Sequence, residues 1–429
     1  MLGAILYLFY LVFKFISARS FYNWSMNDLK IKINREAAKL SLASISNLVE
    51  DLICYAYKSG ASDIHLDPLE ENFNVRVRID GQLLNLFYFS KSIHAAVISR
   101  IKILAGLRTD EHQAPQDGRF RLKLNTEDFL DLRVSVVPTY YGENCVLRLL
   151  VTKNSVQSLE HLHFSRSDIA KILRSLKKLG GMLLVTGPTG SGKTTTLYTL
   201  LKLLNQPGIS LVTIEDPVEY AIVGIKQIQV NHASGLTFSS GLRSILRQDP
   251  DIIMVGEIRD SETAKISVNV ALTGHLLLST LHTNDAATTL PRLLDMGIES
   301  YLVASTVNLV IGQRLVRKIC EQCKREQDVW PESLKEFQQH LPADSGKIKF
   351  FEGAGCESCE GTGFKGRLAL CEVLEMSEVI RTAILNKHPA SEIKKIAQLE
   401  GMRTLVQDGF EKAVSGLTTL GEILKVLNE

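Results

Sequence analysis

A glycine-rich segment in the middle of the chain carries the pattern typical of a phosphate-binding loop. It consists of Gly187, Pro188, Thr189, Gly190, Ser191, Gly192, Lys193 and Thr194. An apolar run precedes it and a helix-forming run follows it, so it joins a strand to a helix. In that setting backbone N–H groups surround phosphate oxygens, the lysine reaches the outer phosphates and the final hydroxyl binds Mg²⁺. The expected ligand is ATP with Mg²⁺, and a glycine turn with a chance lysine is the weaker alternative.

Acidic residues follow two further apolar runs, at the points where strands are expected to end. Glu215 follows the run 210–214, and Glu257 comes soon after the run 252–255. Because the carboxyl ends of parallel strands form the ligand-binding edge of an open sheet, these residues are expected near the glycine-rich loop. Transfer of a phosphoryl group to water needs acidic groups that hold hydrated Mg²⁺ and orient the water. We therefore predict that Glu257 positions the attacking water, with Glu215 as the second choice.

Two histidines flank the apolar run 276–281. His275 precedes this run and His282 follows it. In a strand this separation puts them at opposite ends, which argues against a shared metal ion. His282, at the carboxyl end, is placed to sense a terminal phosphate, but each histidine also fits a hydrogen-bonded core residue.

Four cysteines form two CxxC pairs. They are Cys320, Cys323, Cys356 and Cys359. Each pair can direct two thiolates at one tetrahedral ion, and four sulfur ligands leave no open position for catalysis. We therefore expect a structural Zn²⁺, with a redox or metal-free pair as the alternative. Residues 327–348, between the pairs, are expected to form a polar helical excursion.

The length of the chain predicts a multidomain protein. Its 429 residues, 45% of them hydrophobic, suffice for two or three cores. Within residues 160–429, the stretch from 164 to about 315 alternates short apolar strands with helical segments, a pattern typical of a parallel sheet covered on both faces. We expect a nucleotide-binding domain there, with a zinc-binding insert at 318–362 and a helical segment at 375–429. The strands expected in it are 182–186, 210–214, 252–255 and 276–281.

Residues 40–155 are expected to form a separate α/β domain, with a hinge at 152–158. Helical spacing and strand alternation both occur in it. The expected helices and strands, with an Asp-Gly hairpin turn after the first strand, are 45–57, 74–79, 93–104, 120–124 and 132–137.

Charge and cysteine content limit the classes of partner and compartment. The chain has 49 basic and 47 acidic residues and no basic block, so no direct contact with nucleic acid is expected. Four of its seven cysteines fall in the two pairs, which favours metal binding in a reducing compartment such as the cytoplasm.

The first 25 residues are unusually apolar. The run from Leu2 to Phe13 precedes Lys14 and Arg19, whereas a cleaved signal peptide carries its charge before the apolar run. One interpretation is a short membrane anchor that leaves the rest of the chain in the cytoplasm. The other is a misassigned start, with translation beginning at Met26.

Several motifs together resemble one family. The glycine-rich loop, the run 213–220, the run 252–260 and the paired-histidine stretch look like the Walker A, Asp box, Walker B and His box of the secretion ATPases of type II secretion and type IV pilus assembly. Further stretches that resemble this family are 61–65, 75–81, 115–119 and 401–405. The resemblance covers residues 45 to 429.

This resemblance implies a homohexameric ATPase with an α/β fold: a PAS-like N-terminal domain followed by a RecA-like P-loop domain with a tetracysteine zinc insert and a helical C-terminal segment. Arg119 and Arg133 match the family's arginines that approach the phosphates. The segment 111–114 departs from the family's basic pattern, which predicts weaker phosphate contacts there. The tetracysteine insert favours assembly over retraction.

The expected partner is an inner-membrane platform protein, and the expected location is the cytoplasmic face of the inner membrane. Residues 1–40 are too few for the further N-terminal domain common in this family, so peripheral or N-terminally anchored membrane contact is an alternative. ATP hydrolysis would then drive assembly or extrusion of pilin-like subunits. Two other functions stay open: the motor of a competence DNA-uptake system, and a non-catalytic nucleotide-binding zinc scaffold.

Overall fold

The computed structural model describes residues 25–39, 41–124, 129–150, 158–327 and 349–427. The chain divides into two units, Met1–Asn154 and Ser155–Glu429, and each is described by itself. The apolar segment 1–25, the hinge 152–158 and the excursion 327–348 lie almost entirely outside the described residues. Among the helices that are described, none combines the length and apolar character needed to cross a membrane.

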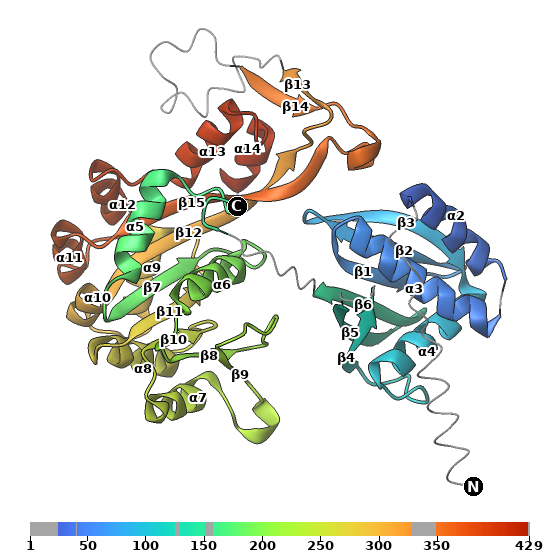
Figure 1. Cartoon of the computed structure of the whole chain (residues 1–429), viewed down its shortest axis with the longest axis horizontal. Coiled ribbons are helices and arrows are strands. Elements are labelled where there is room, and N and C mark those ends of the chain that lie inside the picture. Colours follow the sequence, from blue (N-terminus) through green and yellow to red (C-terminus); the bar gives the residue numbers. More distant parts are fainter. Residues whose placement is uncertain (1–24, 40, 125–128, 151–157, 328–348, 428–429) are drawn as a thin grey trace. The chain divides into compact units, whose positions relative to one another are not determined.

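The first unit contains a six-stranded antiparallel sheet with strand order β3-β2-β1-β6-β5-β4 (Figure 1). Its helices and strands are α2 (Met26–Ala37), α3 (Leu42–Lys58), β1 (Ala61–Pro68), β2 (Asn72–Ile79), β3 (Gln82–Ser90), α4 (His94–Ala105), β4 (Gln116–Lys123), β5 (Phe129–Thr139) and β6 (Gly142–Leu150). The two helices and three strands expected from sequence are confirmed as α3, α4, β2, β4 and β5, whereas α2, β1, β3 and β6 were not predicted.

Alternation along the strands decides which face of this sheet is covered. In β2, Val75 and Val77 are buried while Arg76 and Arg78 are partly exposed. The buried side chains pack with α2, α3 and α4 in one hydrophobic core, and within the described residues of this unit the other, charged face of the sheet has no helix on it. The expected Asp-Gly turn joins β2 to β3, and positive φ at both of its residues suits a tight hairpin.

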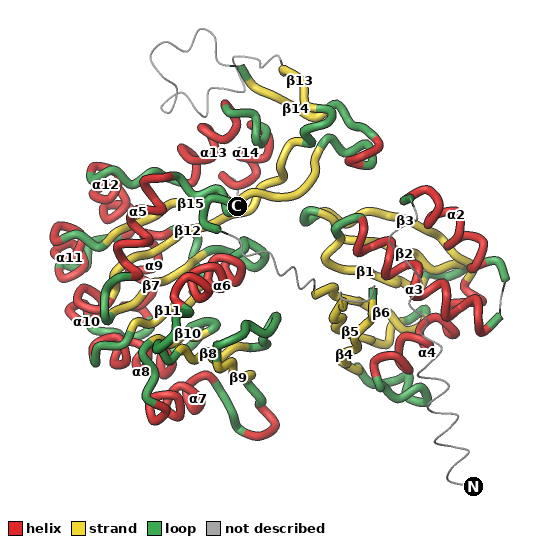
Figure 2. Tube along the Cα trace, viewed as in Figure 1, coloured by secondary structure: helices red, strands yellow, loops and turns green. Residues whose placement is uncertain are grey.

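The second unit contains a seven-stranded sheet with order β15-β12-β7-β11-β10-β8-β9 (Figures 1 and 2). Every neighbouring pair is parallel except β12 and β15. Its strands are β7 (Gly181–Thr186), β8 (Leu211–Glu215), β9 (Lys226–Gln229), β10 (Ile252–Val255), β11 (Leu276–Leu281), β12 (Val307–Ile319) and β15 (Phe364–Glu375). The four expected strands are confirmed as β7, β8, β10 and β11, with bounds that differ by at most one residue at an end.

Helices cover both faces of this sheet, as the apolar runs predict. Met182 and Leu184 pack in the core formed with α7 to α12, and Leu183 and Val185 pack in the core formed with α5 and α6. The helices are α5 (Arg166–Leu176), α6 (Lys193–Leu204), α7 (Phe238–Ile245), α8 (Ser261–Leu272), α9 (Ala286–Asp295), α10 (Ser300–Thr306), α11 (Glu378–Leu385), α12 (Ala390–Leu399), α13 (Leu405–Val414) and α14 (Leu420–Leu427).

Strands β12 and β15 continue past the sheet as a two-stranded arm (Figure 1). Pairing of β12 with β7 ends at Gly312, whereas pairing of β12 with β15 continues to Ile319. The arm leads to the short pair β13 (Lys324–Gln327) and β14 (Phe350–Gly353), and to the four cysteines.

Candidate functional site

The glycine-rich loop lies between β7 and α6, at the carboxyl edge of the sheet. Gly187, Gly190 and Gly192 have φ of 147°, 80° and 88°, a region that favours glycine. A Cβ on Gly187 would lie 2.3 Å from the backbone oxygen of Gln313, and one on Gly192 would lie 2.9 Å from its side-chain Nε2. The loop therefore needs glycine both for its turns and for its approach to β12.

Lys193 begins α6, and its buried ammonium group donates to the carbonyl oxygens of Gly187 at 2.8 Å and Pro188 at 3.0 Å. Burial lowers the pKa of Lys193 to about 8; the Glu257 carboxylate opposes this shift and the Arg314 charge adds to it. The Ser191 hydroxyl is buried and has no hydrogen-bond partner in the described part of the chain. A confined cation and a spare buried hydroxyl fit a bound phosphate group, and the exposed Thr194 residue fits a ligand of its Mg²⁺.

Glu257 lies just beyond β10, and its carboxylate contacts two basic side chains. One oxygen is 2.5 Å from Arg259 Nη2, and the other is 3.3 Å from His282 Nε2. The Glu257 side chain is only 13% exposed, and hydrogen bonding to it raises the pKa of Arg259. Since the Glu257 charge also acts on Lys193, the structure brings three residues from separate motifs into one site.

Glu215 ends β8 at the same edge, but its carboxylate already accepts hydrogen bonds from other side chains of the same unit. It is buried and accepts hydrogen bonds from Thr213 Oγ1 at 2.5 Å, Gln227 Nε2 at 3.1 Å and the Tyr198 hydroxyl. These three donors tie β8 to β9 and to α6, the helix that follows the glycine-rich loop. Glu215 is therefore held by three hydrogen bonds within its own unit and is 3% exposed, whereas the Glu257 side chain is more open at 13%.

The two histidines lie at opposite ends of β11, as their spacing predicts. His275 Nδ1 lies 3.2 Å from the Val270 carbonyl oxygen and 3.1 Å from Thr273 Oγ1, in the turn between α8 and β11. His282 alone is at the edge with Glu257.

The sequence did not lead us to expect that side chains of β12 lie against the glycine-rich loop. Gln313 is buried behind it and accepts a hydrogen bond from Thr196 Oγ1 at 2.7 Å, and the buried Arg314 acts on the charge of Lys193. A signal was present, because Gly312, Gln313 and Arg314 interrupt an otherwise apolar run.

Arg119 and Arg133 lie in the first unit, on the open face of its sheet. They are directly opposite each other on β4 and β5, and Arg133 is opposite Arg148 of β6. Arg119, Arg133 and Arg148 thus form an arginine row across three strands. Like charges placed opposite each other destabilise a sheet, so a contribution to the stability of the fold does not explain this row. At the end of the row next to β1, Asp63 compensates the positive charge: its carboxylate is 3.0 Å from Arg148 Nε and 3.8 Å from Arg78 Nε. The guanidinium groups of this row are suited to binding a polyanion. Arg148 is identified as a member only by the pairing of β5 with β6 in the structure.

The four cysteines converge beyond the arm. Their sulfur atoms lie within 4.8 Å of one another, and the Sγ–Sγ distances are 3.8 Å for Cys320–Cys356, 3.8 Å for Cys323–Cys359 and 3.7 Å for Cys356–Cys359. A tetrahedral ion with Zn–S bonds of about 2.3 Å requires sulfur separations of about 3.8 Å. The donor set therefore fits Zn²⁺ with four thiolate ligands and no open position.

Backbone donors support one of these thiolates directly. Cys359 Sγ accepts from the N–H groups of Cys356 at 3.1 Å and Gly363 at 3.3 Å. Burial opposes ionisation, but these bonds, together with hydrogen bonds from the Cys356 and Cys323 side chains, outweigh it and lower the pKa of Cys359 to about 6. A sulfur that is readily deprotonated is suited to metal binding.

Curated relatives share most of this chain. The type IV pilus assembly ATPase PilB of Thermus thermophilus is 46% identical over 386 residues, which are 90% of this chain and 43% of that protein. The type II secretion system protein E of Xanthomonas campestris is 46% identical over 389 residues, which are 91% of this chain and 68% of that protein. The chain thus spans less than half of the first relative's length and about two thirds of the second's.

Solved structures and a family model agree with these relatives. The pilus retraction motor PilT with bound ADP matches with a TM-score of 0.60 and 26% identity, covering 88% of this chain and 96% of that one. The ATPase DotB of Legionella pneumophila has a TM-score of 0.66 at 21% identity, covers 88% of this chain and 95% of its own, and shows likeness of fold alone. The family model described as type II/IV secretion system protein matches residues 38–425. The mixed α/β chain with its tetracysteine cluster therefore belongs to the type II/IV secretion system protein family.

Proposed function

We propose that this chain is an ATP hydrolase that drives assembly or extrusion of pilin-like subunits, in type IV pilus biogenesis or type II secretion. The observation that supports it best is the convergence of Lys193, Glu257 and His282 at the ends of β7, β10 and β11. Relatives at 46% identity that are named for pilus assembly and type II secretion support the proposed biological process.

The chemistry proposed for the site follows from the position of each group. Lys193 exchanges its two carbonyl partners for phosphate oxygens, which concentrates positive charge on the group being transferred. Glu257 orients the attacking water, and His282, beside it, senses the terminal phosphate. Thr194 is the proposed hydroxyl ligand of Mg²⁺, whose charge helps to neutralise the phosphates. Glu215 fixes β8 against α6 and is a positioning residue.

We further propose a division of labour between a PAS-like domain at about 40–155 and a RecA-like motor domain at 160–429. In a homohexameric ring, the arginine row that includes Arg119 and Arg133 would approach the nucleotide. Closure and reopening around ATP would move an inner-membrane platform protein at the cytoplasmic face of that membrane. The proposed role of Zn²⁺ at the arm is structural.

Phosphate release from ATP tests the site assignment. Lys193→Ala is expected to lower the rate of release by about 100-fold or more, because a cation aimed at the transferred group is lost. Lys202→Ala is the matched control, since Lys202 lies on the same helix and packs against Tyr220. Equal release by the wild type and Lys193→Ala would remove the assignment, and wild-type protein without hydrolysis would favour the scaffold function instead.

A further inference from the structure

Glu372 is a buried carboxylate that the proposed chemistry does not use. It lies on β15, opposite Gly312 of β12, and is 1% exposed. A Cβ on Gly312 would lie 2.8 Å from the Glu372 Cγ atom and 3.0 Å from the backbone nitrogen of Ala286. Glycine at position 312 therefore leaves the space through which this carboxylate reaches Ala286.

The two oxygens of Glu372 join the first turns of two helices. Oε1 accepts from the N–H of Ala286, the first residue of α9, at 2.6 Å, and Oε2 accepts from the N–H of Leu405, the first residue of α13, at 3.3 Å. Burial raises the pKa of Glu372, while these two bonds and the Lys394 charge oppose the shift. The first N–H groups of a helix have no hydrogen-bond partner within the helix. The Glu372 side chain therefore supplies an acceptor to one such N–H group in each of two helices.

The loop that leads into α9 also carries His282. Only residues 283–285 separate His282 from Ala286. On one side, the Thr283 N–H donates to Thr186 Oγ1 at 3.1 Å, and Thr186 is the last residue before the glycine-rich loop. On the other side, Asp285 caps α9 and accepts from Lys394 of α12 at 2.8 Å. The loop is thus held between β7 and contacts with the C-terminal helices.

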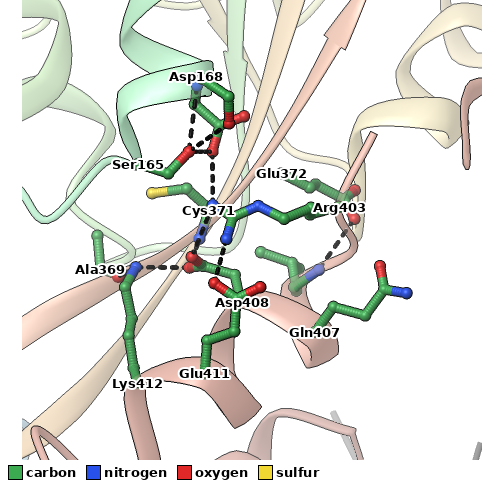
Figure 3. Close-up of polar contacts among 12 residues, drawn as sticks. Ser165, Asp168, Ala369, Cys371, Glu372, Arg403, Gln407, Asp408, Glu411 and Lys412 are labelled. Atoms are coloured by element: carbon green, nitrogen blue, oxygen red, sulfur yellow. Dashed lines mark hydrogen bonds and ion pairs between the residues drawn. The ribbon is translucent and has the colours of Figure 1, made fainter. Parts of the chain in front are cut away.

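A buried ionic cluster fixes the α13 end of this connection (Figure 3). Arg403 Nη2 is 3.0 Å from Asp168 and 3.5 Å from Asp408, and Lys412 Nζ is 2.5 Å from Asp408. Asp168 lies in the first turn of α5, so the cluster ties α13 to α5 as well. Leu405 therefore begins a helix that ion pairs fasten to α5, and Glu372 connects its N–H group to the start of α9.

We infer that Glu372 is a positioning residue for the nucleotide site: by anchoring the start of α9, it holds His282 beside Glu257. This inference rests on the proposed function. Since His282 follows directly from β11 and is about half exposed, the anchor at Ala286 limits how far its loop departs from the sheet edge. A small displacement of a group in the site is enough to lower the rate of the chemical step.

The test compares three variants with the wild-type chain. Glu372→Met keeps the length of the side chain but removes both acceptors, and Glu372→Gln keeps one oxygen. Glu375→Met is the control, because Glu375 lies on the same strand but pairs with Arg174 at the surface. Turnover of MgATP gives kcat and KM, and hydrogen exchange without nucleotide reports the amides of 283–290. Thermal melting shows that each variant is folded.

We expect Glu372→Met to lower kcat about tenfold with KM changed less than about twofold, and Glu372→Gln to recover most of the loss. Exchange in 283–290 rises in Glu372→Met and stays near the wild-type rate in Glu375→Met. If Glu372→Met does not fold, a loss of kcat of about threefold at unchanged KM in Glu372→Gln supports the inference instead.

An unchanged kcat in a folded Glu372→Met protein overturns the inference, as does unchanged exchange in 283–290. Wild-type protein that does not hydrolyse ATP is a different result, because it contradicts the proposed function. The exchange measurement remains informative in that case, since it reports whether Glu372 anchors α9 without any turnover.

Discussion

The glycine-rich loop and the tetracysteine centre are both recognised from short motifs, but they are built in opposite ways. The loop belongs to a site whose groups come from three strand ends, and Lys193 there bonds to carbonyl oxygens that a phosphate can replace. The cysteine centre is local, and its sulfurs already have the separations that a tetrahedral ion requires. The first arrangement suits a ligand that is exchanged, and the second suits a metal ion that stays bound.

This difference indicates that different parts of the molecule contribute to folding stability and to ATP turnover. Contacts that must be remade in every cycle are expected to contribute little to folding, whereas closed sites contribute strongly. Variants at the cysteine centre should change stability more than turnover, and variants at Glu257 should change turnover more than stability. Four experiments can break or sharpen this contrast, in order of decreasing expected effect.

Removal of one zinc ligand has the largest expected effect. Cys359→Ser should reduce the bound zinc from one ion per chain to almost none, because structural Zn²⁺ binds with about 10 kcal/mol or more. Metal analysis and thermal melting measure the loss. Cys371→Ala, at a buried cysteine outside the cluster, should keep its zinc. Full zinc content in Cys359→Ser would contradict the closed four-sulfur site.

Glu257→Gln should affect turnover and leave the fold intact. We expect kcat to fall by about 100- to 1000-fold, roughly 3 to 4 kcal/mol in the barrier, while nucleotide binding persists. Single-turnover hydrolysis and calorimetric binding separate the two quantities. Glu215→Gln is the comparison, since it should lower thermal stability through its three buried partners. Equal losses of stability in both variants would mean that the two carboxylates share one structural role.

Acid should weaken the support that Glu422 gives to the arm. Burial opposes ionisation of Glu422, but Arg317 at 2.7 Å and Lys425 at 2.6 Å outweigh it and lower its pKa to about 2. The folded pKa is below the ordinary 4.5, so this stabilisation is complete above pH 4.5 and is lost as the pH falls toward 2. The loss amounts to about 3 kcal/mol. Calorimetry between pH 6 and 3 should show a smaller pH dependence in Glu422→Gln than in wild type.

Tyr198→Phe has the smallest expected effect. It removes the buried hydroxyl donor to Glu215 and should cost about 1 to 2 kcal/mol of stability with little change in kcat. Denaturant unfolding and phosphate release measure the two quantities. A large fall in kcat at unchanged stability would show that Glu215 acts on the ligand, contrary to the positioning role proposed for it.

Local motifs allowed the strands around the candidate site, the separation of its histidines and the cysteine cluster to be predicted. Apolar runs located β7, β8, β10 and β11, because strands buried on both faces must be apolar throughout. The spacing of His275 and His282 separated them correctly, since their distance along an extended strand is fixed by its rise per residue. The cysteine spacing likewise predicted a cluster that the structure contains.

The sequence by itself determined the elements and motifs whose meaning is local: the strand, glycine-rich turn and helix around Lys193, the two cysteine pairs, and the acidic strand ends. Only the tertiary structure decided that Glu215 is saturated by donors while Glu257 faces His282, and that Glu372 joins two helix starts. It also placed Gln313 behind the loop and aligned Arg148 with Arg133. These facts depend on strand order and register between distant segments, and one residue's shift in register would turn every side chain of a strand to the other face.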